Sequence, residues 1–317
     1  MDILSAPHIL AIGESLVDIL HRPDRPDDVV ETPGGSPANT AMTLGRLGRR
    51  IVLETWLGRD ERGRTVTEHF RDSHVYIPPE SFGATRTTTA TATLNERGAA
   101  TYTFDIEWAP RTPIPVSPNA RIVHAGSISA VIQPGGPAIL DALHRAHDQA
   151  IVTYDPNIRP DIMGSPEESI DTILDFVRAA DIVKVSDEDI AWLTNDAPLD
   201  EVVSDWLGLG PSLVIVTRGS KGAMARSVSG MQCAATPADI PVVDTVGAGD
   251  SFTGGIIDAL WGLGLVGADA REALRTLDEA TAMKILTRAS RISDITVSRA
   301  GANPPWLSEL SESELND

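Results

Sequence analysis

The segment formed by residues 244–255 carries the clearest chemistry in the sequence. It reads Asp-Thr-Val-Gly-Ala-Gly-Asp-Ser-Phe-Thr-Gly-Gly, and the run after Asp250 has the apolar period of a helix. Small residues before that helix would leave free backbone N–H groups at its positive end, which suits a transferring phosphate; they are Gly247, Ala248 and Gly249. Asp250 could then accept a proton from a hydroxyl group. The alternative is that Asp250 only caps the helix.

A second glycine-containing segment, residues 33–48, reads Pro-Gly-Gly-Ser-Pro-Ala-Asn-Thr-Ala-Met-Thr-Leu-Gly-Arg-Leu-Gly. The serine and proline at residues 36–37 are typical of a helix N-cap and of the first helical residue, so we expect a helix to begin here. Gly34 and Gly35 would let a ligand approach the backbone, and Asn39 would lie in the first turn beside it. The alternative is a tight helix entry without a ligand.

Short runs rich in Val and Ile predict the sheet that positions these segments. They lack strict alternation, which is typical of strands buried on both faces; they are residues 9–12, 51–57, 121–125, 150–154, 181–185 and 213–217. Helix-like stretches lie between them, at residues 138–149, 166–179 and 199–207. This alternation predicts an α/β fold whose mostly parallel sheet carries helices on both faces.

Two stretches depart from that alternation. Residues 17–32 have no helical period, and residues 85–106 have Thr at alternating positions around a polar turn that contains Gly98. The second pattern predicts a β-hairpin. We expect one domain over residues 1–317, with a small β-sheet lid formed by segments at about 16–33 and 84–108. The alternative is an edge hairpin without a role.

Composition excludes several classes of protein. The chain has 317 residues, with 45 acidic and 26 basic side chains and a net charge of −19, so nucleic acid and anionic membranes are not expected partners. The single cysteine, Cys233, cannot form an internal disulfide. The first 20 residues lack a basic region before a long apolar run, and no uncharged apolar run approaches 18 residues. We therefore expect a cytoplasmic protein without a signal peptide or membrane span.

Further motifs follow one another along the chain. They are Gly13-Glu14 with Asp18, Gly58-Arg-Asp-Glu-Arg-Gly63, Asp155-Pro-Asn-Ile-Arg159, Lys184-Val-Ser-Asp-Glu-Asp189, Thr217-Arg-Gly-Ser-Lys-Gly222 and Arg299-Ala-Gly-Ala-Asn-Pro-Pro305. With the two glycine-containing segments, they resemble the ribokinase-like (PfkB) family of sugar kinases over nearly the whole length. The motifs are most similar to those of bacterial fructokinases. The resemblance implies transfer of the γ-phosphate of ATP to a primary hydroxyl of a small sugar, with Mg²⁺ bridging the phosphates.

The resemblance also implies roles for individual residues. Asp250 corresponds to the catalytic base of the family, and residues 247–249 correspond to its anion hole. The implied sugar contacts are Asp18, Gly34, Gly35 and Asn39. The implied nucleotide contacts are Lys184, Thr217, Arg218, Gly219 and Gly222. The two β stretches correspond to a lid whose closure excludes water from the transferring phosphate.

Metal ions enter through the same resemblance. The family often has an Asn-x-x-Glu motif that affects magnesium and phosphate, and here the matching positions are Ser186 and Asp189. Asp189 is one methylene shorter than the usual Glu, which is a departure from the pattern. Several members bind a monovalent cation such as K⁺ beside the anion hole. Asp244, with the backbone carbonyls of Val246 and Gly301, matches part of that site.

The substrate leaves alternatives open. Fructose is the first choice, and a kinase for 2-keto-3-deoxygluconate or another sugar is the alternative. A sugar acid needs a cationic contact, for which Arg86 and Arg159 are the candidates. A different class is a sugar-binding regulator that has lost catalysis. The hypothesis of a nicotinamide-dependent oxidoreductase depends only on the sequence Gly-Leu-Gly-Leu-Val-Gly at residues 262–267. This sequence follows a helical stretch, whereas a dinucleotide-binding motif follows a strand. An exposed antiparallel lid could also pair with the lid of a second copy, giving a homodimer.

Overall fold

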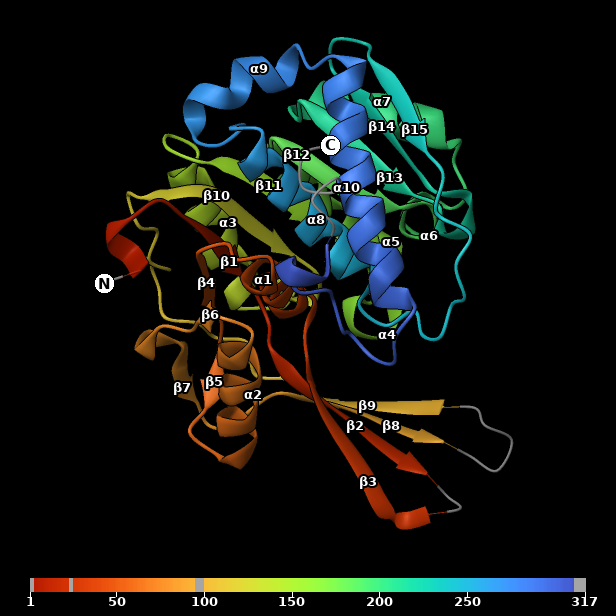
Figure 1. The fold of residues 1–317 in the computed structure, drawn as a ribbon. Helices are drawn as coiled ribbons and strands as arrows, with labels where there is room; N and C mark the ends of the chain where they lie inside the picture. The colour runs from red at the N-terminus through yellow and green to blue at the C-terminus, as the bar shows by residue number, and fades with distance from the viewer. Residues whose placement is uncertain (1–2, 23–24, 95–99, 311–317) are drawn as a thin grey trace.

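The computed structural model describes residues 3–22, 25–94 and 100–310. Its main element is a nine-stranded sheet with the strand order β15-β14-β13-β12-β11-β10-β1-β4-β6 (Figure 1). The strands are β1 (His8–Ile12), β4 (Ile51–Glu54), β6 (Val75–Tyr76), β10 (Ala120–Gly126), β11 (Ile151–Asp155), β12 (Ile182–Ser186), β13 (Leu213–Thr217), β14 (Ala223–Ser227) and β15 (Gln232–Ala235). All neighbours from β13 to β6 are parallel, whereas β14 and β15 are antiparallel additions at one edge.

Helices cover both faces of this sheet, as the alternation of elements predicts. One face carries α1 (Ser36–Arg46), α8 (Ala248–Gly262) and α10 (Glu279–Val297), and the other carries α3 (Gly135–Ala146), α5 (Pro166–Ala179), α6 (Asp187–Thr194) and α7 (Leu199–Leu209). The remaining α-helices are α2 (Glu61–Asp72), α4 (Pro160–Met163) and α9 (Arg271–Arg275), and a two-stranded sheet pairs β5 (Leu57–Gly58) with β7 (Phe82–Ala84). The expected strand at residues 51–57 is therefore two short strands.

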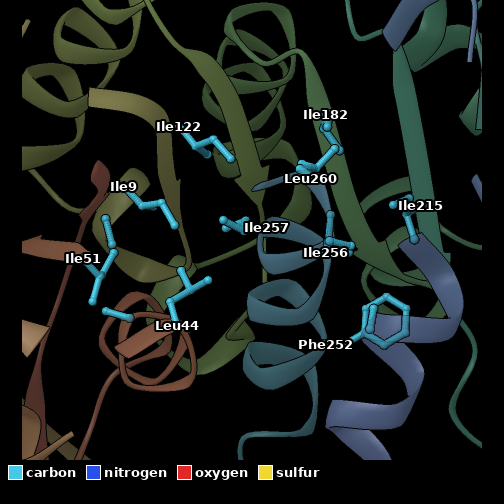
Figure 2. Packing of buried hydrophobic residues seen from close by; sticks show 14 of the residues in the cluster. Ile9, Leu44, Ile51, Ile122, Ile182, Ile215, Phe252, Ile256, Ile257 and Leu260 are labelled. Carbon is cyan, nitrogen blue, oxygen red and sulfur yellow. The ribbon is translucent and has the colours of Figure 1, made fainter. Parts of the chain in front are cut away.

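Alternate residues of each central strand enter two separate cores. Leu213 and Ile215 of β13 face α8 and α10, while Val214 and Val216 pack into the core on the opposite face. Figure 2 shows the first core, in which Ile215 and the isoleucines of the parallel strands meet the apolar side of α8. A strand buried on both faces needs apolar residues at every position, which explains its continuous Val and Ile run.

The two stretches that depart from the strand–helix alternation form a second sheet, with the order β3-β2-β8-β9. Its strands are β2 (Leu16–Arg22), β3 (Arg25–Gly34), β8 (Thr89–Leu94) and β9 (Ala100–Asp105). This sheet projects from the body of the protein as a separate blade (Figure 1). The predicted antiparallel pairing of β8 with β9 is present, and the predicted turn at Gly98 lies outside the described residues. In the described part of the chain, no helix is both long enough and apolar enough to cross a membrane.

Candidate active site

A cavity of about 600 Å³ lies where the projecting sheet meets the main body. Its walls come from β2, β8 and β9, from the N-terminal ends of α1 and α8, and from the loop after β11. Eight of the sequence-predicted residues line it together; they are Asp18, Gly35, Asn39, Arg159, Val246, Gly247, Gly249 and Asp250. Segments that are far apart in the sequence thus converge on one space large enough for a small ligand.

The N-terminal end of α8 presents Asp250 to this cavity. Gly247 is the N-cap, with a left-handed φ of 74°, and a Cβ atom there would lie 2.6 Å from the Cβ of Ala302. Asp250 is the third residue of the helix and makes no capping hydrogen bond, so the interpretation as an N-cap is wrong. Its carboxylate instead accepts hydrogen bonds from Ser36 Oγ at 2.7 Å and from Asn39 Nδ2 at 2.8 Å. The backbone N–H groups of the first turn therefore have no side-chain cap.

The N-terminal end of α1 differs from the prediction by one residue. Gly35 is the N-cap, with a φ of 111°, and Ser36 is the first residue of the helix. The positive φ and a close contact explain the glycine, because a Cβ atom on Gly35 would lie 2.5 Å from the carbonyl oxygen of Glu14. A Cβ atom on Gly34 would lie 2.5 Å from Asp18 Oδ2. Gly34 thus makes room for Asp18, and it is not among the residues that line the cavity.

Burial controls the acidity of two of the carboxyl groups that line the cavity, those of Asp18 and Asp250. It raises the pKa of Asp250 above its ordinary value, and the hydrogen bonds from Ser36 and Asn39 oppose that rise. Burial also raises the pKa of Asp18, to about 6, although the nearby Arg159 guanidinium lowers it. Both carboxylates are therefore stronger proton acceptors than an exposed aspartate would be.

A buried ion pair lies beneath the glycine turn. Lys184 Nζ is 2.9 Å from Asp155 Oδ2, and the side chains are only 5% and 2% exposed. Thr253 Oγ1 donates to the same carboxylate oxygen at 3.0 Å. Burial alone would lower the pKa of Lys184, but neighbouring carboxylates, Asp155 first among them, raise it above its ordinary value. A Cβ atom on Gly249 would lie 3.1 Å from Lys184 Nζ, so this ammonium group lies directly behind the turn.

The other predicted nucleotide contacts lie at the carboxyl end of β13. Thr217 ends that strand beside Ser186 of β12, and the 3₁₀ turn Gly219–Lys221 follows Arg218. Gly222 has a φ of 84°, and a Cβ atom there would lie 2.1 Å from the carbonyl oxygen of Ala235. None of the four residues from the Thr217–Gly222 motif lines the 600 Å³ cavity. They share its edge of the sheet, where α/β proteins bind ligands.

The two carboxylates predicted to take part in metal binding, Asp189 and Asp244, accept hydrogen bonds from backbone N–H groups. Asp189 Oδ1 accepts from the N–H of Ile158 at 3.0 Å, and Asp189 Oδ2 accepts from the N–H of Ser186 at 3.2 Å. Asp244 accepts from the N–H groups of Val246 and Gly301, and these bonds lower the pKa of Asp244. Among the described residues, no three His, Cys, Asp or Glu side chains gather as metal ligands would. The metal roles of Asp189, Asp244, Val246 and Gly301 stay predictions.

The two arginines predicted to contact a sugar acid lie in different places. Arg159 lines the cavity, whereas Arg86 is exposed, pairs with Asp105 on β9 and does not line it. Sequence reasoning also missed two residues that contact the site. Ser36 was interpreted as a helix cap, and Asn157 lies in a motif that suggested no role for it. A signal for Asn157 was its place directly after a buried strand, where polar side chains reach the sheet edge.

Comparison with known proteins connects this geometry to a family. Residues 6–308 match the family described as pfkB family carbohydrate kinase. A probable fructokinase-4 of Arabidopsis thaliana is 32% identical over 95% of this chain and 94% of its own. A fructokinase of Rhizobium leguminosarum bv. trifolii is 32% identical over 80% of this chain and 79% of its own.

Solved structures give the same match. A fructokinase from Xylella fastidiosa superposes with a TM-score of 0.83 and 26% identity over 95% of this chain and 96% of that one. A double mutant of a fructokinase from Vibrio cholerae O395, bound to fructose, ADP and a potassium ion, superposes with a TM-score of 0.73. It is 25% identical over 93% of this chain and 94% of that one.

Proposed function

The chain belongs to the pfkB family of carbohydrate kinases and is therefore a sugar kinase, and we propose that it transfers the γ-phosphate of ATP to a primary hydroxyl of fructose. One observation carries the proposal. The cavity combines a buried carboxylate, Asp250, with an uncapped helix N-terminus and with polar side chains that suit sugar hydroxyls. The fructokinases among the relatives support the choice of fructose.

The proposed reaction assigns each step to a group of this chain. Asp250 takes the proton from the sugar hydroxyl as the oxygen bonds to the γ-phosphorus, and the bond from that phosphorus to the bridging oxygen of ADP breaks. The N–H groups of residues 247–249 stabilise the charge on the transferring phosphoryl group. Lys184 lies behind that turn and adds a positive charge from within the protein. Closure of the projecting sheet would exclude water, the competing acceptor.

Magnesium is proposed to arrive with the nucleotide. Mg²⁺ keeps several waters and usually binds one or two carboxylates together with substrate phosphates. The described residues at this edge form no cluster of three metal-ligand side chains, so such a binding mode fits it. Asp189 is the carboxylate proposed to contact it, through its remaining lone pairs. When bound, the ion would neutralise charge on the phosphates. We also propose a K⁺ site at Asp244, Val246 and Gly301, and the potassium-bound Vibrio cholerae fructokinase supports that choice.

The charges of the cavity favour a neutral sugar over a sugar acid. Its charged lining residues are Glu14, Asp18, Arg159, Asp161 and Asp250, so four carboxyl groups oppose one guanidinium. A sugar carboxylate would enter a site of the same sign, which is unfavourable. The second candidate cation for such a substrate, Arg86, is paired with Asp105 outside the cavity. Fructose therefore suits the site better than 2-keto-3-deoxygluconate.

The test is ADP release with Mg-ATP across fructose, ribose, 2-keto-3-deoxygluconate and adenosine. We expect turnover with fructose and a loss of about 10²–10⁴-fold in the Asp250→Asn variant, the usual contribution of general base catalysis. Asp269→Asn, at an exposed position in the 3₁₀ turn Ala268–Ala270 beyond the C-terminal end of α8, is the matched control. Full activity in Asp250→Asn would contradict the assignment of the base. Fructose binding without turnover would favour the sugar-binding regulator.

The projecting sheet supports one further proposal about assembly. We propose that two copies pair through it, because this sheet exposes apolar side chains at Val29, Val30 and Tyr102, although Val29 and Val30 point to opposite faces. Light scattering at working concentration should give the mass of a dimer. A monomeric mass that persists at high concentration would overturn this assembly without affecting the proposed reaction.

A further inference from the structure

Four polar side chains form a line of hydrogen bonds that ends on the proposed base. Arg159 Nη1 donates to Asn157 Oδ1 at 2.8 Å, Asn157 Nδ2 donates to Ser36 Oγ at 2.7 Å, and Ser36 Oγ donates to Asp250 Oδ1 at 2.7 Å. The four residues come from three elements: Asp250 from α8, Ser36 from the first turn of α1, and Asn157 and Arg159 from the loop after β11. The line therefore exists only in the folded chain.

The direction of every bond in this line is fixed by chemistry. A guanidinium group has only donors, so the amide oxygen of Asn157 faces Arg159 and its NH₂ group faces Ser36. A serine hydroxyl has one proton. Because Asn157 occupies a lone pair of Ser36 Oγ, that proton is free to point at Asp250. Two of these donors have further acceptors: Asn157 Nδ2 also donates to Asp250 Oδ1 at 3.3 Å, and Arg159 Nη1 also donates to the carbonyl oxygen of Ile158 at 2.9 Å. Successive bonds along the line strengthen one another.

We propose that Ser36 and Asn157 are positioning residues, which fix the orientation of Asp250 and hold its carboxylate in the charged form that accepts the sugar proton. The proposal rests on the assignment of Asp250 as the base. Asn39 holds the second oxygen of the carboxylate at 2.8 Å. The remaining lone pairs of the two oxygens are then the ones left for the sugar hydroxyl.

The buried position of Asp250 makes the hydrogen bonds from Ser36 and Asn39 important for keeping its carboxylate charged. Burial raises the pKa of Asp250, and Ser36 is the first of the groups that lower it again. The charged groups that face it from neighbouring elements are Asp18 on β2, Asp155 on β11, Arg159 in the loop after β11 and Lys184 on β12. Glu14, in the loop after β1, lines the same cavity. Acids and bases thus face Asp250 together, and the neutral donors add to the stabilisation of its charge.

The experiment compares the pH dependence of kcat in four proteins: wild type, Ser36→Ala, Asn157→Gly and Thr40→Val. Glycine tolerates the positive φ of 38° at residue 157. Thr40 is a matched control, because its buried hydroxyl donates to the backbone oxygen of Asp250, not to the carboxylate. Ser36→Ala removes a hydrogen bond to the charged carboxylate, so the pKa of Asp250 should rise. The acidic limb of the kcat profile, where kcat falls as Asp250 is protonated, should then move to higher pH by roughly one to two units. We expect the limb of Thr40→Val to stay in place.

Two additional variants test the line itself. Ser36→Thr keeps the hydroxyl and should keep the limb of the wild type. Asn157 Nδ2 is 2.7 Å from Ser36 Oγ and 3.3 Å from Asp250 Oδ1, so its stronger bond is to Ser36. The double variant Ser36→Ala/Asn157→Gly should therefore shift the limb little more than Ser36→Ala does. Equal shifts in Ser36→Ala and Thr40→Val, or no shift in either, would overturn the proposal.

A titration without turnover separates this proposal from the proposed function. Carbon-13 NMR of protein labelled at the aspartate carboxyl carbon follows Asp250, whose signal is the one missing in Asp250→Asn. We expect the same upward shift in Ser36→Ala in this measurement. A wild type that turns over no sugar would refute the proposed function, and the NMR titration would still decide whether Ser36 and Asn157 hold the carboxylate charged.

Discussion

Replacing Lys184 by methionine should destabilise the protein strongly. Lys184 and Asp155 are 5% and 2% exposed, and 2.9 Å separates their charged atoms. Without the ammonium group, Asp155 keeps the hydroxyl of Thr253 on one oxygen, while its other oxygen has no hydrogen-bond partner among the described residues. Removing one partner of a buried pair costs about 3–5 kcal/mol, because the remaining charge stays in a poorly hydrated place. This is a large part of a typical unfolding free energy of about 5–15 kcal/mol.

A double variant tests whether the unpaired buried charge of Asp155 is the cause of the instability. In Lys184→Met/Asp155→Leu neither charge remains, so the double variant should regain most of the lost free energy of unfolding. The exposed pair Arg178–Asp175, with side chains 49% and 55% exposed, supplies the control. Arg178→Met should cost less than about 1 kcal/mol, since solvent screens such pairs.

Equilibrium unfolding in urea, followed by circular dichroism and extrapolated linearly to water, measures all three variants. The reasoning would be refuted if Lys184→Met cost less than about 1 kcal/mol on the scale of exposed pairs. It would also be refuted if the double variant were as unstable as the single one. Activity gives a separate result. The double variant should stay impaired in kcat, because it lacks the positive charge behind Gly249.

Two further predictions concern the sugar site and the packing of α8. The pKa of Asp18 is raised by burial to about 6, so KM for the sugar should rise as the pH falls below about 6 and the carboxylate loses its charge; Asp18→Asn should abolish that dependence in initial-rate measurements. Gly255→Ala should lower stability by about 1–3 kcal/mol, because a Cβ atom there would lie 2.6 Å from the Cα of Ala289 on α10. In the same thermal unfolding series, Gly208→Ala should not destabilise, since a Cβ atom on this exposed glycine meets nothing within 4 Å.

The sequence predicts the main sheet well because its strands are buried on both faces. The helix over residues 166–179 is also predicted with its observed bounds, since Ser165 and Glu168 form a capping box before an apolar period. The two antiparallel strands at one end of the main sheet, β14 and β15, were not predicted. They are short and mix buried with exposed positions, so neither a continuous apolar run nor a long alternation marks them.

The site was predictable to a smaller extent. Local pattern identifies the two glycine-containing turns, but Ser36 and Asp250 are 214 residues apart, and nothing local indicates that they touch. The assignment of Ser36 as an N-cap failed for a related reason. A Gly-Ser pair offers two candidates for the cap, and the contact of Gly35 with the backbone at Glu14 decides between them. Such contacts depend on the tertiary structure.

The way the helices begin connects fold to function. Helices α2, α5, α6 and α10 are each capped by the side chain of a Ser or Asp residue. Among the described α-helices, only α1 and α8 combine a glycine N-cap of positive φ with no side-chain cap, and both begin at the cavity. With glycine as the N-cap, the missing side-chain cap costs only a few tenths of a kcal/mol of stability. The sequence-predicted caps of these two helices, Ser36 and Asp250, instead form a hydrogen bond with each other. The N–H of Ala248 already donates to the carbonyl oxygen of Thr245, and that of Ser36 donates to Glu14 Oε1. A bound phosphate or sugar oxygen would therefore be an acceptor for the first-turn N–H groups that follow them.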